Sequence, residues 1–416
     1  MTTNTNSVQK AKNDEQIAAL SAWAKIGYKG TYEGTTGVGK TRVGCLAAGE
    51  HIKRDQKFRV LITTPTQNLR DIEWVNELNK WGYGKYLSTG NIIIECIQSA
   101  YLRSNEHWNL LILDEVHTTL SPQYRKLLMN NHFDKILGLT ATIQDDEEKL
   151  LFLKQYAPIC YRTPLSKALQ LGIVSPFIVY NLPIELTSTE RKEYDFHNKT
   201  FFETFPLFDY DLKELYKCVA DKIYFEKKLS YNGKTYQKYK NYPYRCSKAL
   251  RTRKSIIYNA QNKIDTVSEI ANKLAVDRKI IIFSESIQFA ERIQQEVDKC
   301  TIFHSDEKKL SNAQRLDNLA KFGQDFFTRI SAVQALNAGL NVPSCDMAIV
   351  ASGTSTSRDF FQRLGRILRI DDKNPNKLAV LIQLYVKDSQ EIKWINARSE
   401  NSPNVKWIQS LKDIQL

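Results

Sequence analysis

The segment 34–41 reads GTTGVGKT, a G-x-x-x-x-G-K-T loop that constrains the fold of this chain more than any other stretch. Such a loop follows a buried strand and opens a helix, and its glycines let backbone N–H groups point at phosphates. The residues before it, YKGTYE at 28–33, are polar, whereas a buried parallel strand is usually an apolar run. The loop alone therefore predicts a nucleotide site but leaves a glycine-rich turn before an amphipathic helix as an alternative.

A second motif supports the nucleotide site. The run NLLILDEVH at 109–117 predicts an apolar strand that ends in Asp114 and Glu115. Ligands bind at the carboxyl edge of an open α/β sheet, so both carboxylates would lie beside a bound nucleotide. Lys40 would then reach the β and γ phosphates, Thr41 and Asp114 would hold Mg²⁺, and Glu115 would polarise the attacking water. The alternative for this pair is an acidic turn at the start of a helix. A chance match to a nucleotide-site motif is disfavoured because the pair follows Lys40 and Thr41 in the same α/β unit.

Short apolar runs separated by helix-like segments recur twice along the chain and predict two parallel-sheet lobes. The apolar runs lie at 58–64, 91–97, 109–115 and 135–142 in the first part, and at 279–283, 300–304, 328–333, 346–352 and 377–385 in the last part. We therefore expect an α/β fold with a first lobe at 1–170, a linker and insertion at 171–262, and a second lobe with a C-terminal tail at 263–416.

The insertion is basic and aromatic. Asn232-Gly233 between Tyr231 and Tyr236 predicts a hairpin with a type I′ turn, followed by a helix near 247–276. Residues 222–263 carry one acidic residue, Glu226, against twelve basic ones: Lys222, Lys227, Lys228, Lys234, Lys238, Lys240, Arg245, Lys248, Arg251, Arg253, Lys254 and Lys263.

Composition narrows the class of partner. A net charge of +13 and a pI near 9.2 favour nucleic acid over membrane as the binding partner, although a basic surface that only aids solubility is an alternative.

The seven cysteines are scattered without a C-x-x-C pair, so neither a disulfide framework nor a zinc site is expected. The histidines other than His117 show no ligand spacing and are assigned to structure or surface. The N-terminal residues lack the apolar core of a signal peptide and no run is long enough to span a bilayer, so we expect a cytoplasmic protein.

Four motifs in this order, GTTGVGKT, DEVH, LTAT and QRLGRILR, resemble motifs I, II, III and VI of the superfamily 2 DExH helicases and translocases. The segments TTPTQNLRDIEWVNELNKWG and ALNAGLNVPSCDMAIVAS resemble motifs Ia and V. The resemblance runs from about Gln16 to Tyr385 and implies two RecA-like lobes in tandem, with a basic, partly helical and hairpin insertion between them. DEVH and the segment 167–194 are most similar to the XPB-like and UvsW-like DNA helicases, the latter being of a viral branch-migration type.

The resemblance also implies roles for single residues. Lys40, Asp114 and Glu115 would be catalytic together with two arginine fingers, Arg366 and Arg369. The helix-like spacing of Gln362, Arg366 and Arg369 puts them on one face independently of the family, where a solvated basic face is the alternative. Asn341 stands where many relatives carry Asp. The implied nucleotide contacts are Gln16, Gly34, Thr35, Thr36, Gly37, Val38, Gly39, Lys40, Thr41, Gly339 and Asn341; Gln16 has an exposed helix position as its alternative.

Further residues are implied to couple the nucleotide to nucleic acid or to bind the polymer. The coupling residues are His117, Thr140, Thr142 and Gln362, although the two threonines could simply finish a strand. The nucleic-acid contacts are Thr64, Pro65, Thr66, Tyr231, Lys234, Tyr236, Lys238, Arg251 and Arg253. For the insertion we hypothesise a wedge at a duplex junction, against an electrostatic clamp or a folded insertion with its tyrosines in the core.

The function expected from these observations is an ATP- and Mg²⁺-dependent DNA helicase or translocase that remodels forked or branched DNA in recombination, repair or replication. An RNA helicase is the alternative within the enzyme class, and a catalytically silent nucleic-acid-binding scaffold is the weaker alternative outside it. We expect a monomer that works with replication or recombination proteins, in the host cytoplasm if the chain is viral.

Overall fold

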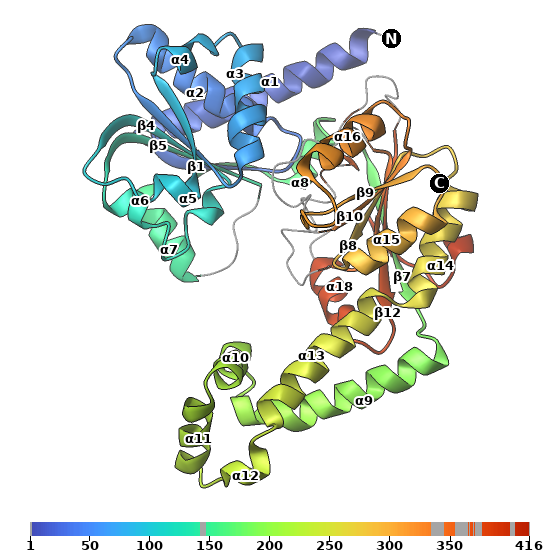
Figure 1. Ribbon diagram of the computed structural model, residues 1–416. Helices are drawn as coiled ribbons and strands as arrows, with labels where there is room; N and C mark the ends of the chain where they lie inside the picture. Colours follow the sequence, from blue (N-terminus) through green and yellow to red (C-terminus); the bar gives the residue numbers. More distant parts are fainter. Residues whose placement is uncertain are drawn as a thin grey trace.

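The computed structural model contains two parallel β-sheets, each with helices against its faces, and a helical insertion that extends away from the second sheet (Figure 1). The structure describes residues 2–141, 147–333, 345–353, 365, 367–368, 370, 377–399 and 404–415. None of the helices in these ranges is both long and apolar enough to cross a membrane.

The first sheet has six parallel strands in the order β3-β2-β4-β5-β1-β6. Its strands are β1 (Lys29–Gly34), β2 (Val60–Thr64), β3 (Ile92–Cys96), β4 (His107–Asp114), β5 (His132–Thr140) and β6 (Ile159–Thr163). The strands predicted at 58–64, 91–97, 109–115 and 135–142 are all present. Strand β6, with the half-buried sequence ICYRT, has no apolar run and was not expected.

The polar strand β1 is nevertheless an inner strand of this sheet, between β5 and β6. Its buried polar groups have partners: Thr31 Oγ1 donates to the carbonyl oxygen of Ala157 at 2.7 Å, and the Tyr32 hydroxyl lies 3.1 Å from Thr163 Oγ1. A Cβ at Gly138 on β5 would come within 2.5 Å of Thr31 Oγ1, so the neighbouring strand leaves room for the threonine. A buried hydroxyl with a hydrogen bond avoids the desolvation penalty of an unpaired one, which explains how a polar sequence forms an inner strand.

Eight α-helices and two short helical turns accompany the described part of this sheet. They are α1 (Thr2–Lys25), α2 (Lys40–Arg54), η1 (Leu69–Glu73), α3 (Trp74–Lys80), α4 (Lys85–Ser88), α5 (Ile97–Ala100), η2 (Val116–Thr118), α6 (Lys126–Met129), α7 (Glu147–Tyr156) and α8 (Leu165–Gln170).

The second sheet has seven parallel strands in the order β13-β7-β12-β11-β8-β10-β9. They are β7 (Phe177–Ile184), β8 (Ile280–Ser284), β9 (Cys300–Phe303), β10 (Arg329–Val333), β11 (Met347–Val350), β12 (Ala379–Val386) and β13 (Val405–Trp407). All five predicted strands of this lobe are present. Strand β7 lies in the range 171–262 expected to be linker, so that boundary is wrong: its apolar residues pair with β12 over eight positions because both strands are buried.

Helices of the second lobe complete the α/β arrangement. They are α14 (Gln261–Glu269), η4 (Ile270–Leu274), α15 (Ile287–Glu296), α16 (Asn312–Gly323), α18 (Glu391–Ser399) and η6 (Leu411–Asp413). A fully buried ion pair joins two of them: Lys263 Nζ lies 2.8 Å from a carboxylate oxygen of Glu391, and that carboxylate also accepts the backbone N–H of Val386. The start of α14 is thereby fixed to the end of β12.

The insertion is entirely helical and contains no hairpin. Helices α9 and α13 run along each other away from the second sheet and carry the remaining helices at their far end (Figure 1). The elements are α9 (Ser188–Thr204), η3 (Phe205–Phe208), α10 (Leu212–Ala220), α11 (Lys222–Tyr231), α12 (Tyr236–Tyr239) and α13 (Tyr242–Tyr258). The single helix predicted near 247–276 is instead divided between α13 and α14, with Ala260 in a non-helical conformation between them.

The hairpin prediction is wrong because Asn232-Gly233 ends helix α11. Gly233 has a φ of 65°, and the N–H of Lys234 donates to the carbonyl oxygen of Leu229 at 2.8 Å. Asn and Gly favour the left-handed conformation both in type I′ turns and after helix ends. The helical spacing of Phe225 and Leu229, both buried in the core of the insertion, decides between the two.

Candidate nucleotide site and nucleic-acid surface

The loop between β1 and α2 has the geometry that phosphate binding requires. Gly37 and Gly39 have φ values of 93° and 83°, in the left-handed region that glycine adopts without strain. Lys40, the first residue of α2, directs its ammonium group back over the loop and donates to the carbonyl oxygen of Gly34 at 2.8 Å. A lysine and the amino end of a 15-residue helix together attract an anion, so these residues fit the phosphates of a nucleotide.

Gln16 on α1 holds the loop from outside. Its side chain is only 2% exposed, which excludes the alternative of an exposed helix position. Its amide nitrogen donates to the carbonyl oxygen of Val38 at 2.8 Å, and its amide oxygen accepts from Arg42. A Cβ at Gly39 would overlap the Gln16 amide, so the glycine is needed for contact as well as for its φ. Gln16 therefore connects α1 to the phosphate loop.

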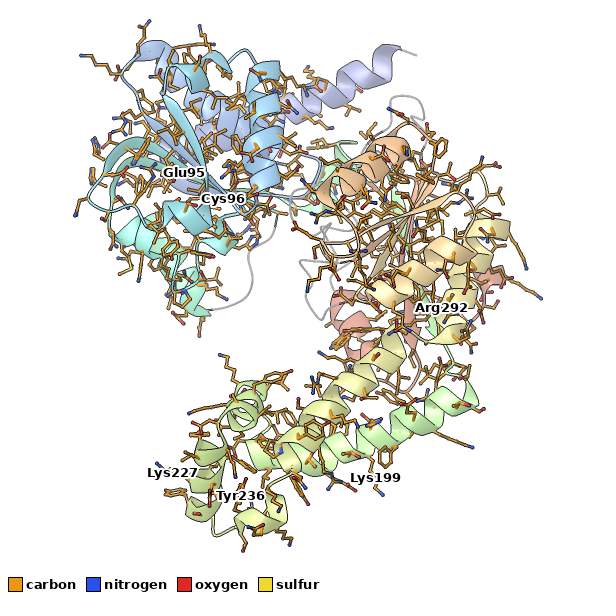
Figure 2. The ribbon with its side chains drawn as sticks, in the orientation of Figure 1. Glu95, Cys96, Lys199, Lys227, Tyr236 and Arg292 are labelled. Atoms are coloured by element: carbon orange, nitrogen blue, oxygen red, sulfur yellow. The ribbon has the colours of Figure 1, made fainter. Side chains whose placement is uncertain are left out.

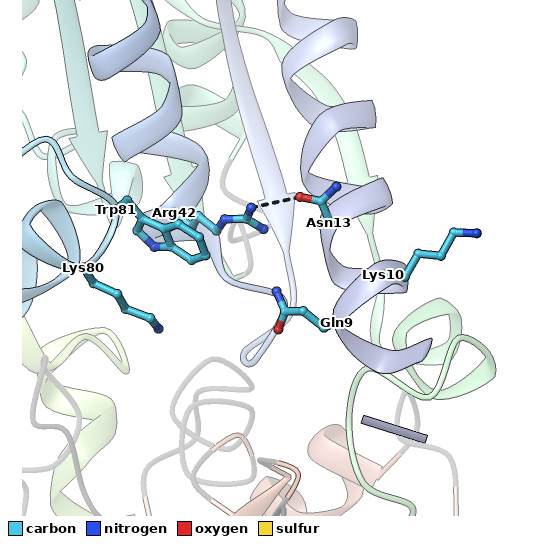
Figure 3. Close-up of a pocket in the computed structure, with 6 residues that line it drawn as sticks. All are labelled: Gln9, Lys10, Asn13, Arg42, Lys80 and Trp81. Atoms are coloured by element: carbon cyan, nitrogen blue, oxygen red, sulfur yellow. Dashed lines mark hydrogen bonds between the residues drawn. The ribbon is translucent and has the colours of Figure 1, made fainter. Parts of the chain in front are cut away.

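A cavity of about 610 Å³ lies between α1 and the end of α3, next to this contact (Figure 3). Arg42 donates to Asn13 Oδ1 at 2.9 Å, and its guanidinium group lies 4.0 Å over the Trp81 ring. The stacked guanidinium and the amides offer both a flat face and hydrogen-bonding groups. The residues that line the cavity are Gln9, Lys10, Asn13, Arg42, Lys80 and Trp81.

Asp114 ends β4 at the carboxyl edge of the sheet and is 7% exposed. The indole N–H of Trp74, the first residue of α3, donates to Asp114 Oδ2 at 2.8 Å. Trp74 reaches this position because α2 carries a glycine there: a Cβ at Gly44 would come within 2.5 Å of the indole ring. Sequence reasoning missed Trp74, since only its helical spacing is visible in the sequence and its partner lies 40 residues away.

Electrostatics at this edge favour a divalent cation. Burial, together with repulsion from the neighbouring Glu115, raises the pKa of Asp114 to about 7, although the Trp74 hydrogen bond and the charge of Lys40 act in the opposite direction. Two adjacent carboxylates are costly without a counter-charge, and carboxylate oxygens are the ligands that Mg²⁺ prefers. The donor set therefore fits Mg²⁺ beside the phosphate loop.

Glu115, His117 and Thr140 form a small cluster at the same edge. Nδ1 of His117 lies 3.4 Å from Glu115 Oε2 and 3.4 Å from Thr140 Oγ1, and the Thr140 hydroxyl lies 3.5 Å from Glu115 Oε2. Glu115 has a positive φ of 49°, which is uncommon for a residue with a side chain and concentrates at functional sites. The structure thus brings the predicted water-polarising carboxylate into contact with two predicted coupling residues.

The second lobe approaches the phosphate loop through the predicted motif VI. A Cβ at Gly365 would overlap the side chain of Thr36 in the loop. Three residues further on, the carbonyl oxygen of Leu368 accepts the N–H of Ser175 at 2.9 Å. Several predicted residues of the same site lie outside the described residues: Thr142, Gly339, Asn341, Gln362, Arg366 and Arg369.

Two of the residues predicted to contact nucleic acid have buried side chains. Thr64 is fully buried at the end of β2, and its hydroxyl donates to the carbonyl oxygen of Thr66 at 3.1 Å. Arg253 is 7% exposed, and its guanidinium group lies 3.7 Å over the Phe201 ring between α13 and α9. Pro65 and Thr66 are half-buried.

Tyr236 does not form the exposed wedge that was hypothesised. It is half-buried and packs against the core of the insertion (Figure 2), whereas Tyr231 at the end of α11 is 93% exposed. Lys228 is paired with Glu214 at 2.9 Å and also with Asp209. Of the twelve basic residues in 222–263, eight are exposed: Lys222, Lys227, Lys234, Lys238, Lys240, Arg245, Lys248 and Arg251.

Comparisons with known proteins agree with this architecture. Residues 9–145 match a family model described as the type III restriction enzyme res subunit, and residues 262–371 match the helicase conserved C-terminal domain. The DNA 3'-5' translocase XPB2 of Sulfurisphaera tokodaii is 30% identical over 402 residues, which cover 93% of this chain and 84% of the relative.

A more distant relative is the XPB helicase/translocase subunit of general transcription and DNA repair factor IIH from Dictyostelium discoideum. It is 23% identical over 303 residues, or 71% of this chain and 31% of that protein, so this chain spans about a third of its length. The crystal structure of the Pyrococcus furiosus Hef helicase domain superposes with a TM-score of 0.57 at 17% identity, covering 92% of this chain and 98% of that one. At this identity the likeness concerns the fold.

Two RecA-like lobes with a phosphate loop and an Asp-Glu pair at the edge of the first sheet define an ATPase of the superfamily 2 helicase class. The resemblance seen in the motifs is thereby confirmed. Within that class the chain belongs to the XPB-like family, as its identity and coverage with the archaeal relative show.

Proposed function

We propose that the chain is an ATP-driven DNA translocase or helicase that remodels forked or branched DNA. The observation that carries the proposal is the contact of Glu115 with His117 and Thr140, because it links the water-polarising carboxylate to the segment of motif III. The names of the two XPB relatives, a DNA translocase and a DNA repair subunit, support DNA as the polymer.

In the proposed reaction, ATP and Mg²⁺ bind at the edge of the first sheet. Lys40 and the loop 34–41 hold the phosphates, Thr41 and Asp114 hold the ion, and Glu115 orients the attacking water. Gln16 keeps the loop in place through its hydrogen bonds with the Val38 carbonyl oxygen and with Arg42. To contact adenine, the Gln16 amide would have to give up one of these two hydrogen bonds. Mg²⁺ supplies charge neutralisation of the transferred phosphoryl group.

Closure of the second lobe would complete the site. We assign Arg366 and Arg369 as arginine fingers on the resemblance to motif VI, and Gly365 beside Thr36 supports an approach of this segment to the loop. On the same basis, Gly339 and Asn341 keep their proposed contacts with the nucleotide, and Thr142 and Gln362 keep their proposed coupling roles. A motor requires ATP to change the distance between two binding sites on the polymer, one on each lobe. Hydrolysis that depends on lobe closure meets this requirement.

We propose the insertion as an electrostatic clamp on DNA and not as a wedge. Arg245, Lys248 and Arg251 follow one another at intervals of three on α13, which places their charges along one side of the arm. Lys227 lies on the helices at its far end (Figure 2). Lys234, Lys238 and the exposed Tyr231 extend this surface, since lysine neutralises phosphates and a tyrosine can stack on an unpaired base.

The first test is steady-state ATP hydrolysis without polymer and with single-stranded DNA, forked DNA, four-way DNA or structured RNA, using Lys40→Ala to exclude contaminating ATPases. Strongest stimulation by branched DNA is the expected result and leads to strand-separation and branch-migration assays. Stimulation mainly by RNA would replace the DNA assignment with an RNA helicase. Absence of hydrolysis with every polymer would favour a nucleic-acid-binding scaffold.

The clamp has its own test. The variant Lys248→Ala/Arg251→Ala should weaken binding to branched DNA and reduce the slope of log K against log salt by up to about 2, because each lost phosphate contact lowers it by about 0.9. Lys273→Ala/Lys308→Ala, a pair of exposed lysines on the second lobe, is the matched control. An unchanged slope in the insertion variant would contradict the clamp while leaving the motor assignment intact.

A further inference from the structure

Four polar side chains gather at the amino ends of two neighbouring strands of the first sheet, at the opposite edge from the nucleotide site. β4 begins at His107 and β5 begins at His132, and the two residues are paired in register. Because alternate residues of a strand point to the same face, Asn109 and Asp134, each two residues further on, share the face of the histidines. The intervening residues are buried on the other face.

The distances between His107, His132 and Asp134 are short enough for their side chains to bind one metal ion together. Nε2 of His107 lies 2.8 Å from Oδ1 of Asp134, and Nε2 of His132 lies 3.5 Å from the same oxygen. The three donor atoms all lie within 4.8 Å of one another, and no other such group of His, Cys, Asp and Glu is found in the described residues. The side chains are 57%, 71% and 39% exposed, so an ion from solvent can reach them.

We propose that His107, His132 and Asp134 form a binding site for one divalent transition-metal ion of the zinc class, with water completing its coordination. Two imidazole nitrogens and one carboxylate oxygen are a donor set that suits Zn²⁺, and neighbouring donors around a tetrahedral Zn²⁺ are about 3.3 Å apart. That value lies between the 2.8 and 3.5 Å separations. Small rotations of the two exposed rings would suffice to bind the ion.

The surroundings support this site. The second carboxylate oxygen of Asp134 accepts from Asn109 Nδ2 at 2.9 Å, which fixes the orientation of the carboxylate as second-layer hydrogen bonds do in metal sites. Partial burial raises the pKa of Asp134, but the hydrogen bonds from His107 and Asn109 leave it below its usual range, so the carboxylate is ionised at neutral pH.

The charged residues next to the His107, His132 and Asp134 cluster have partners outside it. Arg59 lies 4.2 Å over the Trp108 ring and donates to the backbone oxygen of His107. Glu106 is paired with Arg103 at 2.8 Å. Neither contact takes up a donor atom of the proposed site, so the three side chains are available to an ion.

The position of the site indicates what the ion does. Asp114 is seven residues along β4 from His107, or about 23 Å at 3.3 Å per residue, so the ion takes no part in ATP hydrolysis. By joining the first residues of β4 and β5 it would stabilise the first lobe. Ligand binding to the folded state alone raises its unfolding free energy.

The test uses the full chain without a histidine tag, after treatment with a chelator. Calorimetric titration with Zn²⁺ should give one ion per chain, and a thermal scan should show a higher Tm with Zn²⁺ than without it. His107→Ala, His132→Ala and Asp134→Asn should each lower the affinity at least tenfold, whereas His197→Ala on α9 should not. Affinity should also fall as the pH is lowered, because protons compete for the imidazole nitrogens.

Cobalt separates this site from the cysteines, six of which are buried. Bound Co²⁺ should show a ligand-field spectrum without a thiolate charge-transfer band. Zn²⁺ binding that remains unchanged in His107→Ala/His132→Ala, or no binding at micromolar Zn²⁺, would refute the site. Since the three positions are exposed, the variants should fold, and their ATPase with Mg²⁺ should match that of the parent chain.

Discussion

Trp74 donates its indole N–H to Oδ2 of Asp114 over 2.8 Å, which makes a buried tryptophan the neighbour of a proposed Mg²⁺ ligand. Hydrogen bonds to charged groups contribute about 1.5 to 3 kcal/mol, equivalent to at least about a tenfold change in an equilibrium. The contact holds Oδ2 toward the indole and so restricts rotation of the carboxylate. Trp74 is therefore a positioning residue for Asp114.

Replacement of Trp74 by Phe should raise the Mg²⁺ concentration needed for half-maximal ATPase activity by about tenfold, since Asp114 loses the donor that orients it. Titration of the ATPase with Mg²⁺ measures the shift. Trp108→Phe is the matched control: it is equally buried and its indole donates to Glu106 at 3.0 Å, at the other end of the same strand. An equal loss of activity in both variants would mean that the effect comes from packing.

The cluster of Glu115, His117 and Thr140 predicts a separate phenotype. Thr140→Val keeps the shape of the side chain but removes the hydroxyl that lies between the carboxylate and the imidazole. We expect polymer-stimulated hydrolysis to fall about three- to tenfold, a modest loss because both contacts of the hydroxyl are long, at 3.4 and 3.5 Å, while hydrolysis without polymer changes less.

The measurement is the ratio of the two rates. Thr63→Val on β2, a buried threonine that contacts the backbone of Ile112 in the same sheet, serves as the control. A proportional decrease in both rates for Thr140→Val would show that the hydroxyl supports chemistry without coupling it to the polymer.

Much of the fold is visible in the sequence because its central strands are apolar runs of the length of a buried strand. β6 escapes this pattern since its residues are only half-buried, and β7 was assigned to a linker although it pairs with β12. The left-handed preference of Asn232-Gly233 serves both turns and helix ends, so by itself it does not distinguish a hairpin from the end of α11. The helical spacing of Phe225 and Leu229 was the available signal.

The candidate site divides in the same way. Lys40, Asp114 and Glu115 lie in contiguous motifs, whose chemistry is local and can be read from spacing. Trp74 and the paired His107 and His132 depend on contacts between separate elements, which spacing along the chain does not reveal. Burial also depends on contacts between separate elements, which is why the sequence does not show that the side chains of Thr64 and Arg253 are buried.

The stability of the insertion should decrease at low pH because Glu214 becomes protonated. Its carboxylate accepts from Lys228 at 2.9 Å and from the Tyr224 hydroxyl at 3.0 Å, and the Lys228 hydrogen bond lowers the pKa of Glu214. A depressed pKa contributes stability above the unfolded-state value of about 4.3, and that contribution is lost as the pH falls through the folded-state value. Protonation of Glu214 thus loosens α10 from α11.

Hydrogen exchange of α10 and α11, corrected for intrinsic rates, should therefore show less protection at about pH 3.5 than at pH 6. Glu214→Gln should reduce protection at pH 6 and remove most of this pH dependence. Glu203→Gln, at an exposed carboxylate 3.9 Å from Lys199, should leave both unchanged. Equal pH dependence in the parent and Glu214→Gln would assign the acid sensitivity to other groups.

Gly365 offers the sharpest test of lobe closure, because any side chain there would overlap Thr36 of the phosphate loop. Thr36 is β-branched and short, so it cannot rotate away without moving the loop. Gly365→Ala should hold the lobes apart and lower ATPase activity about a hundredfold or more, the scale expected when an arginine finger no longer reaches the phosphates. DNA binding without nucleotide should be retained.

The double variant Thr36→Gly/Gly365→Ala removes the overlapping atoms, so its activity should recover to that of Thr36→Gly alone. If the double variant remained as inactive as Gly365→Ala, the glycine would be required for its backbone conformation and not for the approach of the two lobes.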